Sequence, residues 1–283
     1  MTVVTDKNIL EYQEDGATLV QGAFGADWIE RLTQAIEEVW AQLDGGETIE
    51  PVWTTKTQNP GMLNTEIYGG VELRNVAPYH AAFKAWIERS PAAQYVSEIT
   101  GAKDVRFWMD STFVKEPETG QDATPWHTDG STYPFWGEQL PTMWVALTDV
   151  DEDNAPMVTL TGSHRYPNRF HSGLSRQDIA LDGYVPWQVL LDMVAADDAP
   201  IKTWPAKAGD MLIFHPQMIH ASKARNPNVQ GRRIGFSTRW IGSDAIWQPD
   251  AYAANIPLLM NNPLLKSGEA PPEGVFPVVY RAG

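Results

Sequence analysis

The sequence predicts an α+β, mainly β protein in which N-terminal helices pack against an antiparallel sandwich or barrel. Helical patterns dominate positions 1–104, strand patterns dominate the stretch from about 105 to 241, and an extension over 242–283 follows. This segregation is typical of the class, because a helical layer can cover one face of an antiparallel sheet. No internal repeat or long linker divides the chain, so its 283 residues are expected to form a single domain.

The composition narrows the classes of partner and of metal site. The net charge of −15 opposes binding to nucleic acid or to an anionic membrane surface. No cysteine is present, so any metal must be held by histidine and carboxylate groups. No apolar secretion segment and no apolar run of membrane length is found, and a soluble, cytoplasmic protein is expected.

The N-terminal part is expected to hold most of the helices. A short helix over Lys7–Gly16 should end at its glycine, and a strand over Ala17–Val20 should follow. Asp27 and Glu30 form a capping-box pattern for the next helix. Its buried stripe consists of the apolar residues at helical spacing, which are Trp28, Ile29, Leu32, Ile36, Val39, Trp40 and Leu43.

The stretch from Gly45 to Val76 is rich in Thr, Asn, Pro and Gly. It is expected to form long loops, with one strand near Pro51–Thr54. Two helices should follow, Tyr79–Glu88 and Ala92–Thr100, the second ended by Gly101.

The strand-rich stretch shows alternating or continuously apolar segments between turn residues. Strands are expected at Val105–Lys115, Thr142–Val150, Pro156–Leu160, Met211–Phe214 and Ile234–Ile241. A polar insertion with some helix is expected at Arg176–Asp182 and Trp187–Asp192.

One short motif suggests a metal site. In Trp126-His127-Thr128-Asp129, an imidazole and a carboxylate stand two residues apart, and in an extended segment they project to the same side. With a second histidine they would occupy one face of a metal ion and leave three open positions, as in non-haem Fe(II) oxygenases. The same pair could also be a simple surface turn. Five other histidines are candidates for the second imidazole: His80, His164, His171, His215 and His220. Strand order favours the last two without choosing between them.

Six segments of the strand-rich stretch occur in a defined order. They are Trp126–Asp129, Met143–Val150, Thr161–Arg165, Gly209–His215, His220–Ser222 and Arg233–Trp240. In this order they resemble the phytanoyl-CoA dioxygenase family of Fe(II)- and 2-oxoglutarate-dependent oxygenases. The resemblance implies a double-stranded β-helix (jelly-roll) core, with Fe(II) as the metal, 2-oxoglutarate as cosubstrate and O2 as oxidant.

The resemblance also implies roles for individual residues. Position by position, His127, Asp129 and His220 are the metal-binding and catalytic residues, because the family's second metal histidine precedes a small residue and a serine, as His220 precedes Ala221-Ser222. His215 then matches a position that is not a ligand.

Three further residues match family positions that bind the cosubstrate. Neighbouring strand residues face opposite sides, so only one of Arg232 and Arg233 can point inward to hold the distal carboxylate. The match of the following strand selects Arg233, although a register slip of one residue would exchange the two. Ser222 and Trp144 match positions beside the cosubstrate, and Trp144 could equally be core packing.

The expected function is therefore oxidation, by hydroxylation first of all, of a small organic substrate, with release of succinate and CO2. Aromatic residues near Phe107–Trp108, Tyr133–Trp136 and Trp187 favour a largely apolar substrate, such as an intermediate of secondary metabolism. Asp129 argues against halogenation, since related halogenases lack this carboxylate, whereas desaturation and ring formation stay open. The alternative is a catalytically silent or zinc-holding jelly roll that binds a ligand or hydrolyses it. The sequence indicates no oligomeric state.

Overall fold

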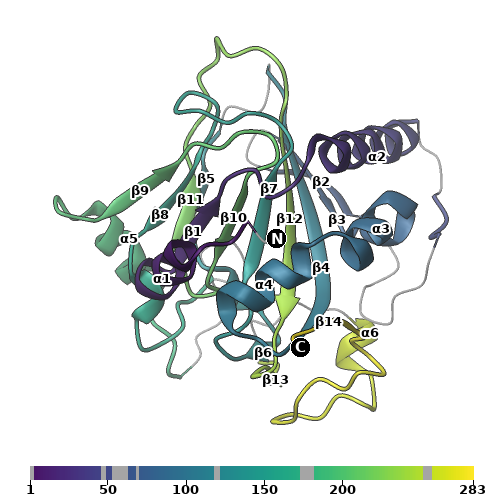
Figure 1. The fold of residues 1–283 in the computed structure, drawn as a ribbon. Coiled ribbons are helices and arrows are strands. Elements are labelled where there is room, and N and C mark those ends of the chain that lie inside the picture. The colour runs from purple at the N-terminus through teal and green to yellow at the C-terminus, as the bar shows by residue number, and fades with distance from the viewer. Residues whose placement is uncertain are drawn as a thin grey trace.

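The computed structural model describes residues 3–45, 49–52, 63–67, 70–117, 122–172, 182–250 and 257–283. Within these residues two antiparallel sheets form the centre of the molecule, and helices cover the outer side of the larger sheet (Figure 1). The structure confirms the predicted class, a mainly β jelly-roll fold with N-terminal helices packed on it.

The larger sheet has eight strands in the order β1-β10-β7-β12-β4-β3-β2, with β14 paired to β4. Their bounds are β1 Ala17–Val20, β2 Leu63–Ile67, β3 Gly70–Arg74, β4 Asp104–Lys115, β7 Thr142–Ala146, β10 Met211–Phe214, β12 Arg233–Ile241 and β14 Val278–Arg281. Strands from both ends of the chain therefore join the same sheet.

The smaller sheet has the order β5-β11-β8-β9. It consists of β5 Thr124–His127, β8 Met157–Leu160, β9 Ile201–Trp204 and β11 His220–Ser222. A third ladder pairs β6 Phe135–Trp136 with β13 Ile246–Trp247.

The helices lie mostly in the N-terminal part. They are α1 Asp6–Asp15, α2 Ala26–Asp44, α3 Ala81–Arg89, α4 Ala92–Thr100, α5 Trp187–Ala195 and α6 Pro257–Met260, with 3-10 turns η1 Ala77–Tyr79, η2 Asp129–Thr132 and η3 Ser163–Arg165. No helix among the described residues is long and apolar enough to cross a membrane.

The two faces of the larger sheet differ in character because strand residues alternate sides. One face carries Val145, Phe236 and Leu73, which pack with residues of α2, α3 and α4 in the main hydrophobic core. The opposite face, which we call the inner face, carries Trp144 and Ser237, a cross-strand pair of β7 and β12. The helices thus bury the apolar face and leave the inner face for the site described below.

The helix and strand predictions were right where local signals are strong. Gly16 and Gly101 end α1 and α4 in the left-handed region, with φ of 86° and 73°. The strand expected over Thr142–Val150 ends at Ala146, and Val150 forms only an isolated bridge with Ala206.

Two local predictions were wrong. The capping box is not formed, because Gly25 is the N-cap of α2 without any side-chain hydrogen bond. The loops expected between Gly45 and Val76 include the hairpin β2–β3. That hairpin is held by pairing of β3 with β4, a long-range interaction that local composition does not reveal.

Two other predictions concern segments that lie partly outside the described residues. Pro51 and Val52 are not in a strand, and the rest of that expected strand lies outside the described residues. The part of the insertion at Arg176–Asp182 also lies almost wholly outside them, whereas α5 confirms helix at Trp187.

Candidate metal centre

Two short strands of the smaller sheet bring two histidines together. His127 at the end of β5 is the cross-strand partner of His220 at the start of β11. Their ring centroids lie 4.2 Å apart. The next residue, Thr128, is extended and leads to Asp129, which begins the turn η2. Asp129 is therefore not on the strand itself, yet it reaches the same side as His127.

Each imidazole is oriented by a carbonyl group. The Nδ1 atom of His127 lies 2.7 Å from the carbonyl oxygen of Pro125, and Nδ1 of His220 lies 2.9 Å from that of Met218. A carbonyl oxygen only accepts, so Nδ1 carries the proton and Nε2 keeps its lone pair, as in metal-binding histidines. Burial, reinforced by the nearby His127, lowers the pKa of His220 to about 4, which keeps this imidazole neutral.

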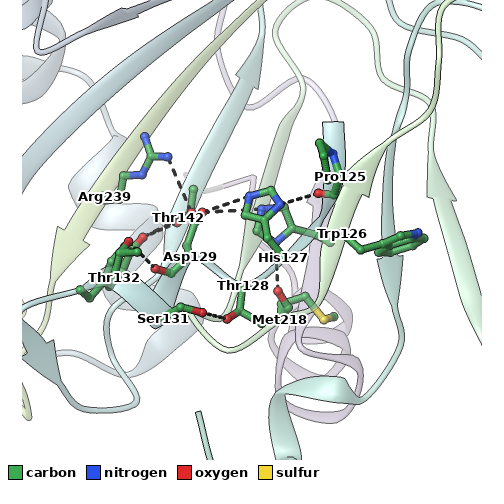
Figure 2. A network of polar contacts seen from close by, with 12 residues as sticks. Pro125, Trp126, His127, Thr128, Asp129, Ser131, Thr132, Thr142, Met218 and Arg239 are labelled. Carbon is green, nitrogen blue, oxygen red and sulfur yellow. Dashed lines mark hydrogen bonds and ion pairs between the residues drawn. The ribbon is translucent and has the colours of Figure 1, made fainter. Parts of the chain in front are cut away.

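Both free nitrogens face one oxygen of Asp129. Oδ1 lies 3.6 Å from Nε2 of His127 and 3.7 Å from Nε2 of His220 (Figure 2). The three ligand atoms lie within 4.8 Å of one another, and no other group of this kind occurs in the described part of the chain. The sequence motif and the strand pairing thus converge on one group of three potential ligand atoms, in which His220 is buried and His127 and Asp129 are partly buried.

The other oxygen of Asp129 is held by the protein. Oδ2 accepts a hydrogen bond of 2.6 Å from Thr142, and it lies 3.7 Å from Nη2 of Arg239 (Figure 2) and 3.4 Å from the Tyr133 hydroxyl oxygen. Burial favours the neutral acid, but Arg239 and the two histidines outweigh it and hold the pKa of Asp129 well below its usual range. The carboxylate is therefore charged and could bind a metal cation.

The remaining histidines are used elsewhere. His215 is buried, accepts from the backbone of Gln217 through Nδ1 and donates to Glu138 through Nε2. His164 contacts the carbonyl group of Gln13, and His80 caps α3. His171 makes a ring contact with Tyr184. None of them is in the metal-binding group.

Neighbouring arginines at the start of β12 point to opposite sides. Arg233 is 2% exposed and stacks on Trp144, with its guanidinium carbon 4.9 Å from the ring centroid. Arg232 lies at the surface and forms ion pairs with Glu37 and Glu116, at 2.6 Å and 2.7 Å. The inward residue is therefore Arg233, the one that the family match selects.

Arg233 has an incomplete set of partners. Nη2 donates to the carbonyl group of Ala155 at 3.3 Å, and Nε is buried with no hydrogen-bond partner among the described residues. Burial and the nearby Arg225 lower the pKa of Arg233 to about 10. Trp144 Nε1 is likewise buried and unpartnered in the described structure. Its indole fits only because position 235 is glycine, where an added Cβ would lie 2.1 Å from Nε1.

Ser222 lies buried at the end of β11. Its hydroxyl donates to Thr124 Oγ1 at 2.9 Å and accepts from the Thr124 backbone at 3.1 Å. The expected contact with a cosubstrate would require this hydroxyl to turn, and it stays a prediction.

The sequence interpretation missed several residues that the structure places in or beside the site. Lys115, 5% exposed, is the cross-strand partner of Arg233, and burial followed by the charge of Arg233 lowers its pKa to about 8. Thr142 and Tyr133 were not singled out for polar roles. Arg239 stands six positions after Arg233 on β12, and even spacing on a strand could have predicted the shared face.

The residues present fit an iron ion and a 2-oxo acid. Two imidazole nitrogens and one carboxylate oxygen on one side are the donor set of non-haem Fe(II) sites. Nε of Arg233 and Nε1 of Trp144 are buried donors that find no acceptor within the described ranges, and a bound carboxylate would supply one. The fold and the site together define a jelly-roll protein of the non-haem iron, 2-oxoglutarate-dependent class.

Comparison with known proteins gives the family within this class. The sequence matches the phytanoyl-CoA dioxygenase (PhyH) family over residues 12–234, and the chain belongs to that family. Peroxisomal phytanoyl-CoA dioxygenase of Rattus norvegicus is 29% identical over 46% of this chain. The iron/alpha-ketoglutarate-dependent dioxygenase ausU of Aspergillus calidoustus is 22% identical over 74% of it. The chain covers 37% and 61% of the lengths of these two relatives.

Solved structures with the same fold include two enzymes of nogalamycin biosynthesis. The non-haem alpha-ketoglutarate-dependent carbocyclase SnoK superposes with a TM-score of 0.69 at 19% identity, covering 99% of both chains. The epimerase SnoN in complex with Fe3+, alpha-ketoglutarate and nogalamycin RO gives 0.68 at 18% identity, covering 97% of this chain and 98% of that one. This likeness establishes the shared fold.

Proposed function

We propose that this protein is an Fe(II)- and 2-oxoglutarate-dependent oxygenase that oxidises a small organic molecule. The observation that carries the proposal is the convergence of two imidazole Nε2 atoms on Asp129 Oδ1, at 3.6 Å and 3.7 Å. Membership of the PhyH family supports it. When bound, the iron and 2-oxoglutarate supply the oxidising chemistry, with release of succinate and CO2.

The roles proposed for the residues follow from their surroundings. The iron would be held by His127, Asp129 and His220. A hydrogen bond orients each of these side chains: Nδ1 of each histidine donates to a carbonyl group, and Oδ2 of Asp129 accepts from Thr142. Arg233 would bind the distal carboxylate of 2-oxoglutarate, with Trp144 and Ser222 beside it. Lys115 adds a second buried positive charge next to Arg233. It donates to the carbonyl group of Asp122, whose carboxylate favours the charged form, and a bound anion would compensate the two charges further.

Hydroxylation is the reaction that we propose first, because Asp129 fills the position that a halide would need. SnoK and SnoN are a carbocyclase and an epimerase, so the fold also accommodates other oxidative outcomes. A substrate from secondary metabolism is supported by the nogalamycin pathway of these neighbours. A cytoplasmic location stays a prediction.

The expected apolar nature of the substrate also stays a prediction. Several aromatic residues that suggested it are used in packing. Phe107 belongs to the helix-covered core, and Trp108 packs edge-on against Tyr133 and Phe135, with ring centroids 4.8 Å and 5.1 Å away.

The decisive experiment is anaerobic addition of Fe(II) and then 2-oxoglutarate to the metal-free protein. The proposal expects a weak visible charge-transfer band and, under O2, formation of succinate that increases with a suitable small molecule. A zinc hydrolase or a silent binding protein would show neither. Absence of both signals in the native chain would overturn the proposed function.

A further inference from the structure

The two carboxylate oxygens of Asp129 have different surroundings. Oδ1 faces the imidazole nitrogens, whereas Oδ2 is surrounded by polar side chains from three places in the fold: Thr142 of β7, Tyr133 after η2, and Arg239 of β12. The Asp129 side chain is only 10% exposed, so water has little access to replace these groups.

The hydrogen-bond directions around Oδ2 follow because each hydroxyl group has only one hydrogen to donate. The Thr142 hydroxyl has one hydrogen, which it donates to Asp129 at 2.6 Å. In its 2.7 Å contact with Tyr133, Thr142 must therefore accept, and Tyr133 donates. Tyr133, Thr142 and Asp129 form a chain of donors that ends on Oδ2, and chains of this kind strengthen their members in a buried setting.

The sheet register determines where this arrangement sits. Arg239 and Thr142 are direct cross-strand partners on β12 and β7, so their side chains project from the same face at the same level. The Tyr133 ring is fixed by Trp108, and the Tyr133 carbonyl group accepts from Arg169 at 3.3 Å. The strand register and the packing of Tyr133 thus place all three side chains around Oδ2.

We propose that Tyr133, Thr142 and Arg239 are positioning residues that hold Oδ2 of Asp129, so that the carboxylate offers only Oδ1 to the metal. A carboxylate that turned to bind through both oxygens would take up one of the positions that the cosubstrate and O2 require. The three residues would therefore keep the metal positions for the cosubstrate and O2 open. This role rests on the proposed function.

The test compares two substitutions of one residue. Thr142→Val keeps the branched shape and removes the hydroxyl, whereas Thr142→Ser keeps the hydroxyl. Thr238→Val is a matched control, since Thr238 is a buried threonine of β12 that contacts Trp240 and Met143. For each protein, Mn(II) affinity is measured from the electron paramagnetic resonance of free Mn(II), and the Fe(II)–2-oxoglutarate band is recorded without O2.

We expect Thr142→Val to weaken Mn(II) binding by roughly tenfold or more, as is usual for residues behind a metal ligand. Its Fe(II)–2-oxoglutarate band should also shift or weaken. Thr142→Ser and Thr238→Val should retain native values for both. Native affinity and a native band in Thr142→Val would overturn the proposal, and so would an equal loss in Thr238→Val.

If thermal unfolding shows that Thr142→Val is not folded, Tyr133→Phe decides instead. Loss of the hydroxyl that donates to Thr142 should lower Mn(II) affinity in the same direction by a smaller factor, and an unchanged affinity and band would overturn the proposal. A native chain that neither binds Mn(II) nor gives a band would overturn the proposed function and this inference together. That result is distinct, because it is seen before any substitution is made.

Discussion

The two ends of the inner face of β12 carry the same residue in opposite electrostatic surroundings. Arg239 lies 3.7 Å from Asp129, and although burial opposes its charge, Asp129 and Tyr133 outweigh that effect and raise the pKa of Arg239. Arg233 has a carbonyl group, an indole and Lys115 around it, and its pKa is lowered to about 10. Asp129 compensates the positive charge of Arg239, whereas no ion pair is found for Arg233 among the described residues.

The difference separates a charge pair within the folded protein, Asp129 with Arg239, from a buried charge that could bind an anionic ligand, Arg233. Buried charges in proteins are normally paired, and an unpaired one is tolerated where a ligand completes it. We call the Asp129–Arg239 region the metal end and the Lys115–Arg233 region the anion end. We expect substitutions at the two ends to have independent effects.

The largest effect is expected from removing an imidazole at the metal end. His220→Ala deletes one of the three ligands, so metal affinity should fall by more than the roughly 100-fold that outer-shell residues can cost. His215→Ala is the control, since His215 is a buried histidine outside the metal-binding group. Equilibrium dialysis with Fe(II) measures both. Metal retention in His220→Ala would remove His220 from the ligand set.

A substitution at the anion end is expected to have a large effect on cosubstrate binding. Arg233→Met should raise the 2-oxoglutarate requirement by roughly 30-fold or more, because loss of one partner of a buried charge pair costs about 2–5 kcal/mol. Arg232→Met, at the surface, should stay close to native. Titration of the Fe(II)-loaded protein with 2-oxoglutarate measures both variants, and the reverse ranking would assign the role to Arg232.

The stability of the metal-free protein should respond in opposite ways at the two ends. Arg239→Met leaves the buried Asp129 charge without its cation and should lower the free energy of unfolding by about 3–5 kcal/mol. Arg233→Met removes an uncompensated charge and should be neutral or stabilising. Urea unfolding compares the two variants. Equal destabilisation would show that Arg233 is paired within the fold.

The smallest effect is a pH dependence of cosubstrate binding. Burial lowers the pKa of Lys115 to about 8, so its ammonium group is charged below that pH and becomes neutral above it. Affinity for the 2-oxoglutarate dianion should therefore be highest below pH 8 and fall as the pH rises beyond it. Lys115→Met should bind more weakly and lose this dependence. A native affinity that is constant from pH 7 to pH 9.5 would exclude Lys115 from the anion end.

Elements that depend on neighbouring residues were predictable. The two helices that end at Gly16 and Gly101 and the strand Met211–Phe214 carry strong local signals, and the structure confirms them. The hairpin β2–β3 was missed because its place in the fold comes from pairing with β4. The strands of the metal centre are four and three residues long, too short for periodicity to identify.

The sequence by itself determined the chemistry available to this protein. Without cysteine, a metal must take imidazole and carboxylate ligands, and the ordered motifs indicated the family. Strand order left His215 and His220 open, and the family resemblance selected His220. Only the tertiary structure decided that His220 pairs with His127 across two strands, that Asp129 presents Oδ1 and buries Oδ2, and that Lys115 lies beside Arg233. The physical reason is that each of these contacts joins residues distant in the chain. A sequence pattern shows which side of its own strand a residue faces, whereas the pairing between strands decides what it meets there.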